Sequence, residues 1–326
     1  GNTTGGTAGA KRGQGSAMTA FDGLPPLRDV VRKHGIAAKK SLGQNFLFDL
    51  NLTARIARAA EPLDDANIIE IGPGPGGLTR ALLSQGARHV TAIERDDRCA
   101  AALEEIAAQY PERLTIIQAD ALDMDYRQLM AGFKDQRAVK IVANLPYNIA
   151  TPLLTRWLEN GIENAARIAA PAAPAWDQMI LMFQREVAAR ITATPAERAD
   201  YGRLAVLCGW LTQSRILFEV PREAFTPPPK VTSAIVELRP LRAPVPCSLE
   251  MLSAVTRAAF GQRRKMIRQS LKTLSLPGGS TDIAGLLEMT ETDPQLRADA
   301  IPVDSYIRLA NAAANLARSN DGSDFE

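Results

Sequence analysis

Short apolar runs alternate with amphipathic stretches between residues 67 and 238 of the chain. Runs of this length bounded by turn residues are typical of buried strands, and the stretches between them have the helical period. The predicted strands are Asn67–Ile71, His89–Glu94, Leu114–Gln118, Val139–Asn144, Gln178–Phe183, Ile216–Val220 and Ala234–Leu238. The predicted helices are Gly77–Ser84, Arg98–Gln109, Thr151–Asn160 and Arg185–Thr194. This alternation predicts an α/β fold with a doubly wound sheet.

The last two predicted strands are joined only by a proline-rich segment, so we expect them to form an antiparallel pair at one end of the sheet. A second proline-rich stretch, "RPLRAPVP" at residues 239–246, is typical of a linker. Beyond it the pattern predicts only helices, at Ser248–Ala259, Arg263–Leu274, Asp282–Glu288 and Asp304–Ala317, and one more amphipathic helix precedes the sheet at Leu50–Ala60. We therefore predict a catalytic domain at residues 29–240 and a small all-helical domain at residues 241–326.

The beginning of the chain is rich in glycine, threonine and serine, which predicts a disordered tail over residues 1–28. A signal peptide is not expected, because the sequence has no basic start followed by an apolar core. A membrane span is not expected either, because no apolar run approaches the ~20 residues that it requires. Three scattered cysteines, Cys99, Cys208 and Cys247, match no metal spacing and are typical of a reducing compartment. We expect a cytoplasmic monomer that uses no metal.

The 326 residues include only two histidines, His34 and His89, which lie far apart. Their isolation argues against a zinc site and against a Ser-His-Asp triad. Any chemistry must therefore proceed without an imidazole base. Net charge is only +2, but basic residues gather between Arg257 and Lys272, where no acidic residue occurs. Clustered charge of one sign is expected where a polyanion binds.

A glycine-rich stretch, "EIGPGPGGLT" at residues 70–79, lies where a strand passes into a helix. Gly72, Gly74 and Gly77 satisfy the dinucleotide fingerprint, and Glu94 ends the next strand, where a carboxylate can bind ribose hydroxyls. The same arrangement accepts either NAD or S-adenosylmethionine. An ordinary glycine-rich turn is the plainer reading, but it leaves the flanking strand, helix and second acid unexplained.

Asp120 follows the third strand, beside the same expected crevice. A carboxylate there can accept the amino group of an adenine. Taken alone, Asp120 is better explained as a helix N-cap. The ligand reading gains because Gly72, Glu94 and Asp120 fall at three successive strand ends.

The fourth strand ends in "NLPYN", residues 144–148. The exocyclic amine of adenine is a poor nucleophile, since its lone pair is delocalised into the ring. Its two N–H groups can donate hydrogen bonds to the Asn144 carboxamide oxygen and to a main-chain carbonyl, that of Leu145 or Pro146. These two hydrogen bonds would free the lone pair. Pro146 helps to turn a carbonyl inward, and Tyr147 offers a face on which a flipped base can stack. A strand-ending turn with a half-buried tyrosine is the structural alternative.

Three further segments carry candidate residues. Phe225, in "AFTPPPKVTSAIVEL" (224–238), is either a second ring around the base or an anchor of its stiff loop in the core. Gln44 and Asn45, in "KKSLGQNFLFD" (39–49), have no obvious structural role. In "FGQRRKMIRQSLK" (260–272), the predicted helix places apolar and basic residues on separate faces, and the basic face can follow a phosphate backbone or simply be solvated.

Together these stretches resemble the ribosomal RNA adenine dimethyltransferase family, and most closely its bacterial members that act on small-subunit (16S) rRNA. The resemblance rests on "SLGQNFL" (41–47), "EIGPGPGGLT" (70–79), "IERD" (93–96), "DAL" (120–122), "NLPYNI" (144–149), "QREV" (184–187), "YGRL" (201–204), "FTPPPKVTSA" (225–234) and "QRRKMIRQSL" (262–271). It implies a Rossmann-like fold and dimethylation of two adjacent adenines in the 3′ terminal hairpin during small-subunit assembly.

The resemblance also implies residue roles. The methyl donor, S-adenosylmethionine, would be bound by Asn45, Leu47, Gly72, Glu94, Asp120 and Asn144. The catalytic residues would be Asn144, Pro146, Tyr147 and Phe225. From the basic segment without acidic residues we expect Arg263, Arg264, Lys265 and Arg268 to bind RNA. Three alternatives stay open: a large-subunit rRNA methyltransferase, an NAD-dependent oxidoreductase, for which no hydride-transfer acid or base is well placed, and a non-catalytic assembly factor.

Overall fold

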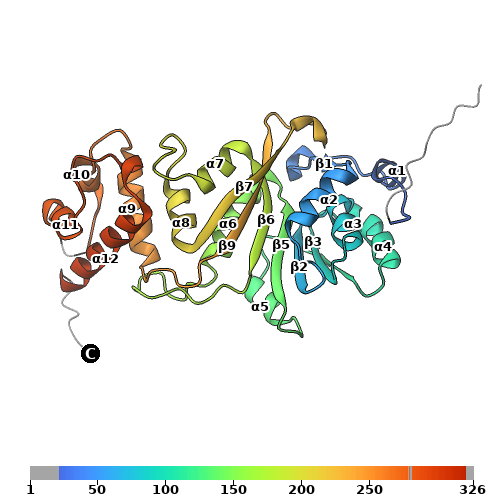
Figure 1. The fold of residues 1–326 in the computed structure, drawn as a ribbon, viewed down its shortest axis with the longest axis horizontal. Helices are drawn as coiled ribbons and strands as arrows, with labels where there is room; N and C mark the ends of the chain where they lie inside the picture. The colour runs from blue at the N-terminus through green and yellow to red at the C-terminus, as the bar shows by residue number, and fades with distance from the viewer. Residues whose placement is uncertain (1–21, 278, 280, 321–326) are drawn as a thin grey trace, which may run out of the picture.

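The fold is centred on a seven-stranded sheet with helices on both faces (Figure 1). The computed structural model describes residues 22–277, 279 and 281–320. In chain order the strands are β1 (Phe46–Leu47), β2 (Ala66–Ile71), β3 (His89–Glu94), β4 (Leu114–Gln118), β5 (Ala138–Asn144), β6 (Gln178–Gln184), β7 (Thr212–Val220), β8 (Phe225–Thr226) and β9 (Ser233–Pro240). The large sheet has the order β4-β3-β2-β5-β6-β9-β7, and β1 pairs with β8 in a separate small sheet.

The five strands from β4 to β6 are parallel, so their carboxyl ends meet along one edge of the sheet. The expected antiparallel pair at the end of the sheet is confirmed, since β9 runs antiparallel to both β6 and β7. Both faces of these strands are buried, which explains why they appear in the sequence as continuous apolar runs. Ile69 points to one face of β2 and Ile68 to the other, and each joins a different buried cluster.

Two layers of helices cover the sheet. The helices are α1 (Leu27–Lys33), α2 (Leu50–Ala59), α3 (Gly77–Ser84), α4 (Ala100–Gln109), α5 (Tyr126–Ala131), α6 (Tyr147–Glu159), α7 (Arg185–Thr192), α8 (Arg203–Leu211), α9 (Leu249–Gly261), α10 (Ile267–Ser270), α11 (Ile283–Met289) and α12 (Val303–Asn320). Buried residues of α1 to α4 pack in one cluster, and those of α5 to α8 pack in the other. The second cluster continues into α9 to α12 at the end drawn in orange and red in Figure 1. The division into domains at residue 240 therefore stays a prediction.

Two predicted helix boundaries were wrong. Instead of one helix over Arg263–Leu274, the chain makes a turn and then α10, followed by a short 3-10 helix, because the main chain of Ile267 bonds to the Leu296 carbonyl at 2.6 Å. Helix α6 begins at Tyr147, one turn earlier than expected, although this places Pro152 inside the helix. The predicted apolar face is nevertheless buried, at Ile267, Leu271 and Leu274.

The end of the expected disordered tail is packed against the protein. Arg80 of α3 is buried and donates to both carboxylate oxygens of Asp22, at 2.8 and 2.9 Å. Leu27 is buried as well. Residues 22–28 are thus part of the fold, because they satisfy a buried cation that would otherwise lack a partner. The rest of the predicted tail, residues 1–21, lies outside the described residues.

Candidate active site

A pocket opens at the carboxyl ends of β2, β3, β4 and β5, with about 1070 Å³ of empty space including its open mouth. It brings together all nine residues predicted to bind the donor or to act on the base. They are Asn45, Leu47, Gly72, Glu94, Asp120, Asn144, Pro146, Tyr147 and Phe225. Neighbouring parallel strands end at the same edge of a sheet, which is why residues far apart in the chain converge here.

The glycine loop needs its glycines for backbone conformation and for space. Gly72, Gly74 and Gly76 have φ values of 62°, 56° and 100°, in the left-handed region that favours glycine. A Cβ on Gly72 would lie 3.5 Å from the ring of Pro146, and one on Gly76 would lie 2.2 Å from the Cδ1 atom of Ile106. The loop therefore brings the end of β2 close to the "NLPY" turn.

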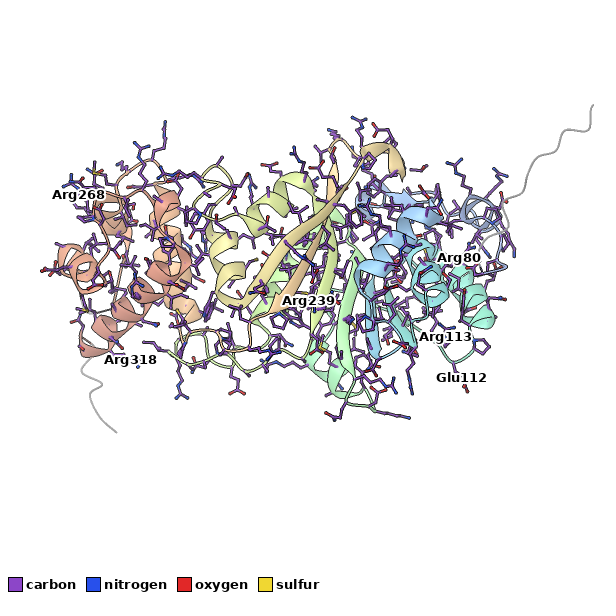
Figure 2. All side chains as sticks on the ribbon, in the orientation of Figure 1. Arg80, Glu112, Arg113, Arg239, Arg268 and Arg318 are labelled. Atoms are coloured by element: carbon purple, nitrogen blue, oxygen red, sulfur yellow. The ribbon has the colours of Figure 1, made fainter. Side chains whose placement is uncertain are left out.

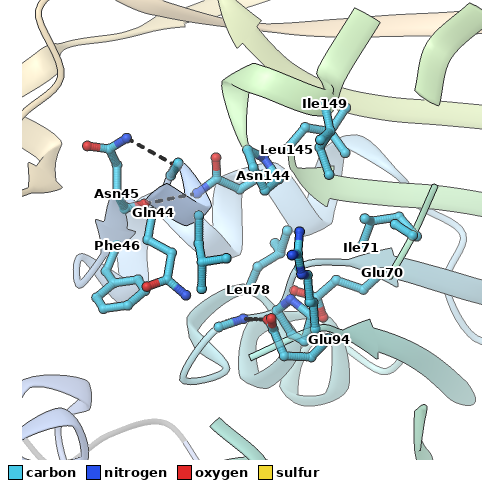
Figure 3. A pocket seen from close by; sticks show the side chains of 18 of the residues that line it. Gln44, Asn45, Phe46, Glu70, Ile71, Leu78, Glu94, Asn144, Leu145 and Ile149 are labelled. Carbon is cyan, nitrogen blue, oxygen red and sulfur yellow. Dashed lines mark hydrogen bonds between the residues drawn. The ribbon is translucent and has the colours of Figure 1, made fainter. Parts of the chain in front are cut away.

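Glu94 is held at the end of β3 by the loops on either side of it. The amide of Gly74 donates to one carboxylate oxygen at 2.8 Å (Figure 3). The amide of Asp96 donates to the other oxygen at 2.8 Å. Burial raises the pKa of Glu94 above its ordinary value. A carboxylate fixed in this way keeps further lone pairs for hydroxyl donors, as binding of a ribose requires.

A second buried carboxyl, Glu70, lines the same pocket and was not singled out as a site residue from the sequence. It is 1% exposed and accepts a hydrogen bond of 2.6 Å from the Thr79 hydroxyl. Burial raises the pKa of Glu70 to about 8. The pocket floor therefore carries two buried carboxyl groups with raised pKa values, which is typical of functional sites.

Asp120 caps the turn after β4 rather than the helix that follows, whose N-cap is Asp125, and its role towards an adenine stays a prediction. One of its oxygens accepts from the Leu122 amide at 3.0 Å and thereby stabilises the turn after β4. The other lies 3.3 Å from the guanidinium of Arg95, which is exposed at the rim of the pocket. Asp120 is thus both a turn residue and a charged group of the pocket rim.

Sequence reasoning missed a network that fixes the N-terminal wall of the pocket. Gln44 donates to Asp96 at 2.8 Å and accepts from the main chain of Lys39 at 2.8 Å. Asp96 also accepts from Arg98, which holds the pKa of that carboxyl at about 2. No structural role of Gln44 was apparent from the sequence. That unexplained polar residue was the only indication of the network.

Asn144 has the geometry expected of an acceptor for an amine. Its carboxamide nitrogen donates to the main-chain carbonyl of Asn45 at 3.5 Å, whereas the Asn45 carboxamide is turned to the Gly43 carbonyl (Figure 3). Its carboxamide oxygen makes no hydrogen bond with any residue that the structure describes and is therefore open to a donor. The Pro146 carbonyl is used by the Ile149 amide at 3.1 Å, whereas the Leu145 carbonyl has no partner within the described part of the chain.

The two aromatic candidates differ in their surroundings. Tyr147 is half-buried at the first turn of α6, and its hydroxyl bonds to that of Ser233. Burial raises the pKa of Tyr147, so the phenol stays neutral. Phe225 is only 2% exposed and pairs with Leu47 between β8 and β1. Its role as a loop anchor is thus evident, while its role as a stacking ring stays a prediction.

The four predicted RNA-binding residues lie at the helical end of the molecule, and Figure 2 labels Arg268 there. Arg264, Lys265 and Arg268 are exposed. Arg263 differs, because it is 35% exposed and donates to the main-chain carbonyl of Arg198. These residues also lie in a turn and a short helix, so they do not form the single helical stripe expected from the sequence.

No helix within the described ranges is long and apolar enough to cross a membrane. Those same ranges contain no group of three or more histidine, cysteine or acidic side chains arranged to hold a metal ion.

A sequence profile of the ribosomal RNA adenine dimethylase family matches residues 35–315. The chain belongs to this family. The ribosomal RNA small subunit methyltransferase A of Rhizobium meliloti (strain 1021) is 56% identical over 294 residues, which cover 90% of this chain and 99% of the relative. The protein of the same name from Methylobacterium radiotolerans is 58% identical over 294 residues, with 90% and 94% covered.

Two solved structures have similar folds. The 23S rRNA methyltransferase ErmE superposes with a TM-score of 0.59 at 28% identity, covering 82% of this chain and 99% of its own. A dimethyladenosine transferase from Plasmodium falciparum gives a TM-score of 0.64 at 22% identity, covering 81% and 95%, which shows the fold alone. The predicted Rossmann-like fold and the resemblance are confirmed, and this member of the family is an rRNA adenine dimethyltransferase. The oxidoreductase and large-subunit alternatives gain no support.

Proposed function

We propose that this rRNA adenine dimethylase dimethylates the N6 amines of two adjacent adenines in the 3′ terminal hairpin of 16S rRNA, within the assembling small subunit. The open carboxamide oxygen of Asn144, placed beside the glycine loop, carries the chemical part of the proposal. The choice of substrate is supported by relatives named as small-subunit methyltransferases that match 90% of the chain.

The pocket fits S-adenosylmethionine as the methyl donor. When bound, S-adenosylmethionine supplies a methyl group attached to a positively charged sulfur. Glu94 would accept hydrogen bonds from the ribose hydroxyls through the lone pairs that the amides of Gly74 and Asp96 leave free. Asp120 would accept a hydrogen bond from the adenine amino group. Gly72 keeps the floor open, because any side chain there would approach Pro146. Asn45 and Leu47, on the wall closed by the β1–β8 pair, would bound the donor on its other side.

Asn144 and the Leu145 carbonyl would activate the target amine. When two acceptors receive hydrogen bonds from its two N–H groups, a tetrahedral nitrogen is favoured. Its lone pair then points away from the ring, towards the methyl group. Of the two carbonyls considered from the sequence, that of Leu145 is the better candidate, since that of Pro146 already accepts a bond in α6. Acceptors that are fixed before the reaction stabilise the transition state more than mobile acceptors do.

Tyr147 and Pro146 would position the flipped adenine. The Ser233 hydroxyl fixes the phenol of Tyr147 and so limits rotation of the ring. Pro146 has no amide hydrogen and a restricted φ, which directs the preceding carbonyl. Phe225 would complete the stacking on the other side of the base. Arg264, Lys265 and Arg268 would contact rRNA phosphates, whereas Arg263 is bonded inward to the Arg198 carbonyl. That the enzyme is monomeric and cytoplasmic stays a prediction.

Replacing the catalytic carboxamide tests the proposal. In Asn144→Ala we expect methyl transfer to under-methylated small subunits to fall by about a hundredfold or more, the effect of losing one fixed polar group at a reacting centre. Binding of S-adenosylmethionine, measured by titration calorimetry, should change far less. Asn51→Ala, which changes the same residue type on the exposed face of α2, is the matched control.

Full activity of Asn144→Ala would contradict the proposed activation of the amine. Methylation of free large-subunit rRNA in preference to small subunits would contradict the proposed substrate. Loss of donor binding together with loss of transfer would show that Asn144 holds the donor and would leave its effect on the amine without support.

A further inference from the structure

Residues 22–25 wrap around a buried cation of α3. The Arg80 guanidinium donates to both oxygens of the Asp22 carboxylate, at 2.8 and 2.9 Å, and to the Pro25 carbonyl at 2.7 Å. The Asp22 carbonyl accepts a further bond of 2.9 Å from Gln109 of α4. The side chains of Arg80 and Asp22 are 2% and 4% exposed. Such a pair holds its two segments together, because removal of either charge leaves the other buried and unpaired.

Helix α1 follows this segment and contacts α4 at its other end. Lys33 donates to the Glu105 carboxylate at 2.6 Å, and the His34 ring nitrogen lies 3.0 Å from the same oxygen. Val30 of α1 is buried in the cluster that also contains the buried residues of α3 and α4. In Figure 1, α1 lies beside α3 and α4, at the end of the molecule away from α9 to α12.

Leu27, the first residue of α1, lines the pocket. A Cβ on Gly77, the first residue of α3, would lie 3.0 Å from the Cδ2 atom of Leu27 and 2.8 Å from the Leu47 carbonyl oxygen. Leu27 and Leu47 therefore cover the start of α3, and a glycine at residue 77 leaves room for both. Leu27 is only 3% exposed, so its side chain is held by packing and leaves the pocket wall only if α1 moves.

The position of Leu27 corresponds to one part of the methyl donor. In the orientation proposed above, the adenine lies beside Asp120 at the end of β4, and the ribose lies beside Glu94 at the end of β3. The strand order β4-β3-β2-β5 leaves the end of β2 and the start of α3 for the sulfur and the amino acid part. An aliphatic side chain at this place would bury the methylene groups of the amino acid part.

We propose that Leu27 is a donor-binding residue, which forms the pocket wall beside the amino acid part of S-adenosylmethionine, and that the Asp22–Arg80 pair positions it. The inference deepens the proposed function and rests on it, since the donor is the one that the proposed methyl transfer requires. Residues 22–34 precede the part of the chain that the family profile matches, so membership of the family does not assign them a role.

Donor binding by full-length variants tests the wall. The probe is S-adenosylhomocysteine, the donor without its methyl group. In Leu27→Ala its dissociation constant, measured by titration calorimetry, should rise about tenfold, because the contact of one aliphatic side chain is lost. 5′-Methylthioadenosine has the adenine, the ribose and the sulfur but lacks the amino acid part. Its dissociation constant should therefore rise by less than about twofold, since the lost contact is one that this ligand does not make.

Val30→Ala is the matched control, because it shortens a buried aliphatic side chain of the same helix that does not line the pocket. Both substitutions should lower the temperature of thermal unfolding, but Val30→Ala should leave binding of S-adenosylhomocysteine unchanged. Equal losses of donor affinity in the two variants would show that Leu27 acts only on the fold and would overturn the proposal. If Leu27→Ala does not fold, Leu27→Val carries the test, with an expected rise of about threefold.

The ion pair is tested through its effect on Leu27. Asp22→Asn removes the charge that matches Arg80 and should raise the dissociation constant of S-adenosylhomocysteine about fivefold. Asp29→Asn, which changes an exposed acid of α1, should have no effect. In Asp22→Asn plus Leu27→Ala, the affinity should be no lower than in Leu27→Ala alone, because Asp22 acts through Leu27. Additive losses would refute the positioning role of the pair.

Unchanged affinity of Leu27→Ala for S-adenosylhomocysteine would refute the wall alone. An equal loss for S-adenosylhomocysteine and 5′-methylthioadenosine would overturn the assignment of Leu27 to the amino acid part. If the wild-type protein bound neither S-adenosylmethionine nor S-adenosylhomocysteine, the proposed function itself would fail, and the wall with it.

Discussion

The pocket and the basic end of the molecule present their predicted functional side chains in different ways. In the pocket, Gly72, Glu94, Asp120 and Asn144 come from or directly follow the ends of four parallel strands, whose register fixes where each side chain lies. At the helical end, basic residues lie in a turn and on short helices, and their directions depend on tertiary contacts. Arg263 shows this, because it bonds inward to a main-chain carbonyl.

Side chains at strand ends are therefore held rigidly, whereas side chains in turns are more adjustable. The proposed methyl transfer would require acceptors that are fixed before the reaction, and Asn144 and the Leu145 carbonyl lie at the end of β5 in the pocket. Binding of a phosphate backbone tolerates small displacements, since charge acts over longer distances. Exposed arginines in a turn are sufficient for that purpose.

A methyl group added to one glycine at each end tests this contrast most strongly. Gly76→Ala should lower the free energy of unfolding by about 3 kcal/mol, because φ is 100° and the new Cβ would lie 2.2 Å from Ile106. Gly261→Ala, at the end of α9, meets no atom within 4 Å and should change stability by less than about 1 kcal/mol. Urea denaturation measures both. Equal losses would show that the pocket loop is no more tightly constrained than the basic turn.

The same contrast explains what could be predicted from the sequence. The positions of Glu94, Asp120 and Asn144 follow from strand periodicity and from the rule that parallel strands end together. The role of Gln44 does not follow, because its partner Asp96 is distant in sequence and nothing local indicates the contact. The local sequence did not decide whether Phe225 anchors its loop or stacks on the base, because the burial of its ring depends on the pairing of β8 with β1.

Errors at the basic end have the same physical origin. The segment from Arg263 to Leu274 has good helical periodicity, and its apolar residues are buried as that period predicts. Main-chain bonds from Ile267 and Arg268 to the segment around Leu296 replace the bonds of a continuous helix. Tertiary contacts therefore override local propensity, which is a weak determinant in short helices.

The buried carboxyl of Glu70 makes the pocket end sensitive to pH in a way that an arginine cluster cannot be. Burial raises its pKa from 4.5 to about 8. The folded protein therefore holds a proton that the unfolded chain has lost between these two values, so stability should fall as pH rises through this window. The fall is at most about 1.4 kcal/mol per pH unit for one proton, and it should level off above the folded-state pKa.

Glu70→Gln isolates this effect, because a glutamine keeps an acceptor for the Thr79 hydroxyl and carries no titrating proton. Its stability, measured by urea denaturation at several pH values, should depend on pH less steeply than that of the wild-type protein. Some dependence should remain, because burial also raises the pKa of Glu94. Parallel curves for the two proteins would contradict the raised pKa of Glu70.

The smallest expected effect separates neighbouring arginines at the basic end. Arg263→Ala should lower the free energy of unfolding by about 1 kcal/mol, because it removes the charged hydrogen bond to the Arg198 carbonyl. Arg264→Ala plus Arg268→Ala should leave stability unchanged, since both side chains are exposed. That pair should instead reduce the salt slope of rRNA binding by about 2, if each arginine contacts one phosphate. An unchanged slope would remove both residues from the RNA interface, and an equal loss of stability in both variants would refute the distinct structural role of Arg263.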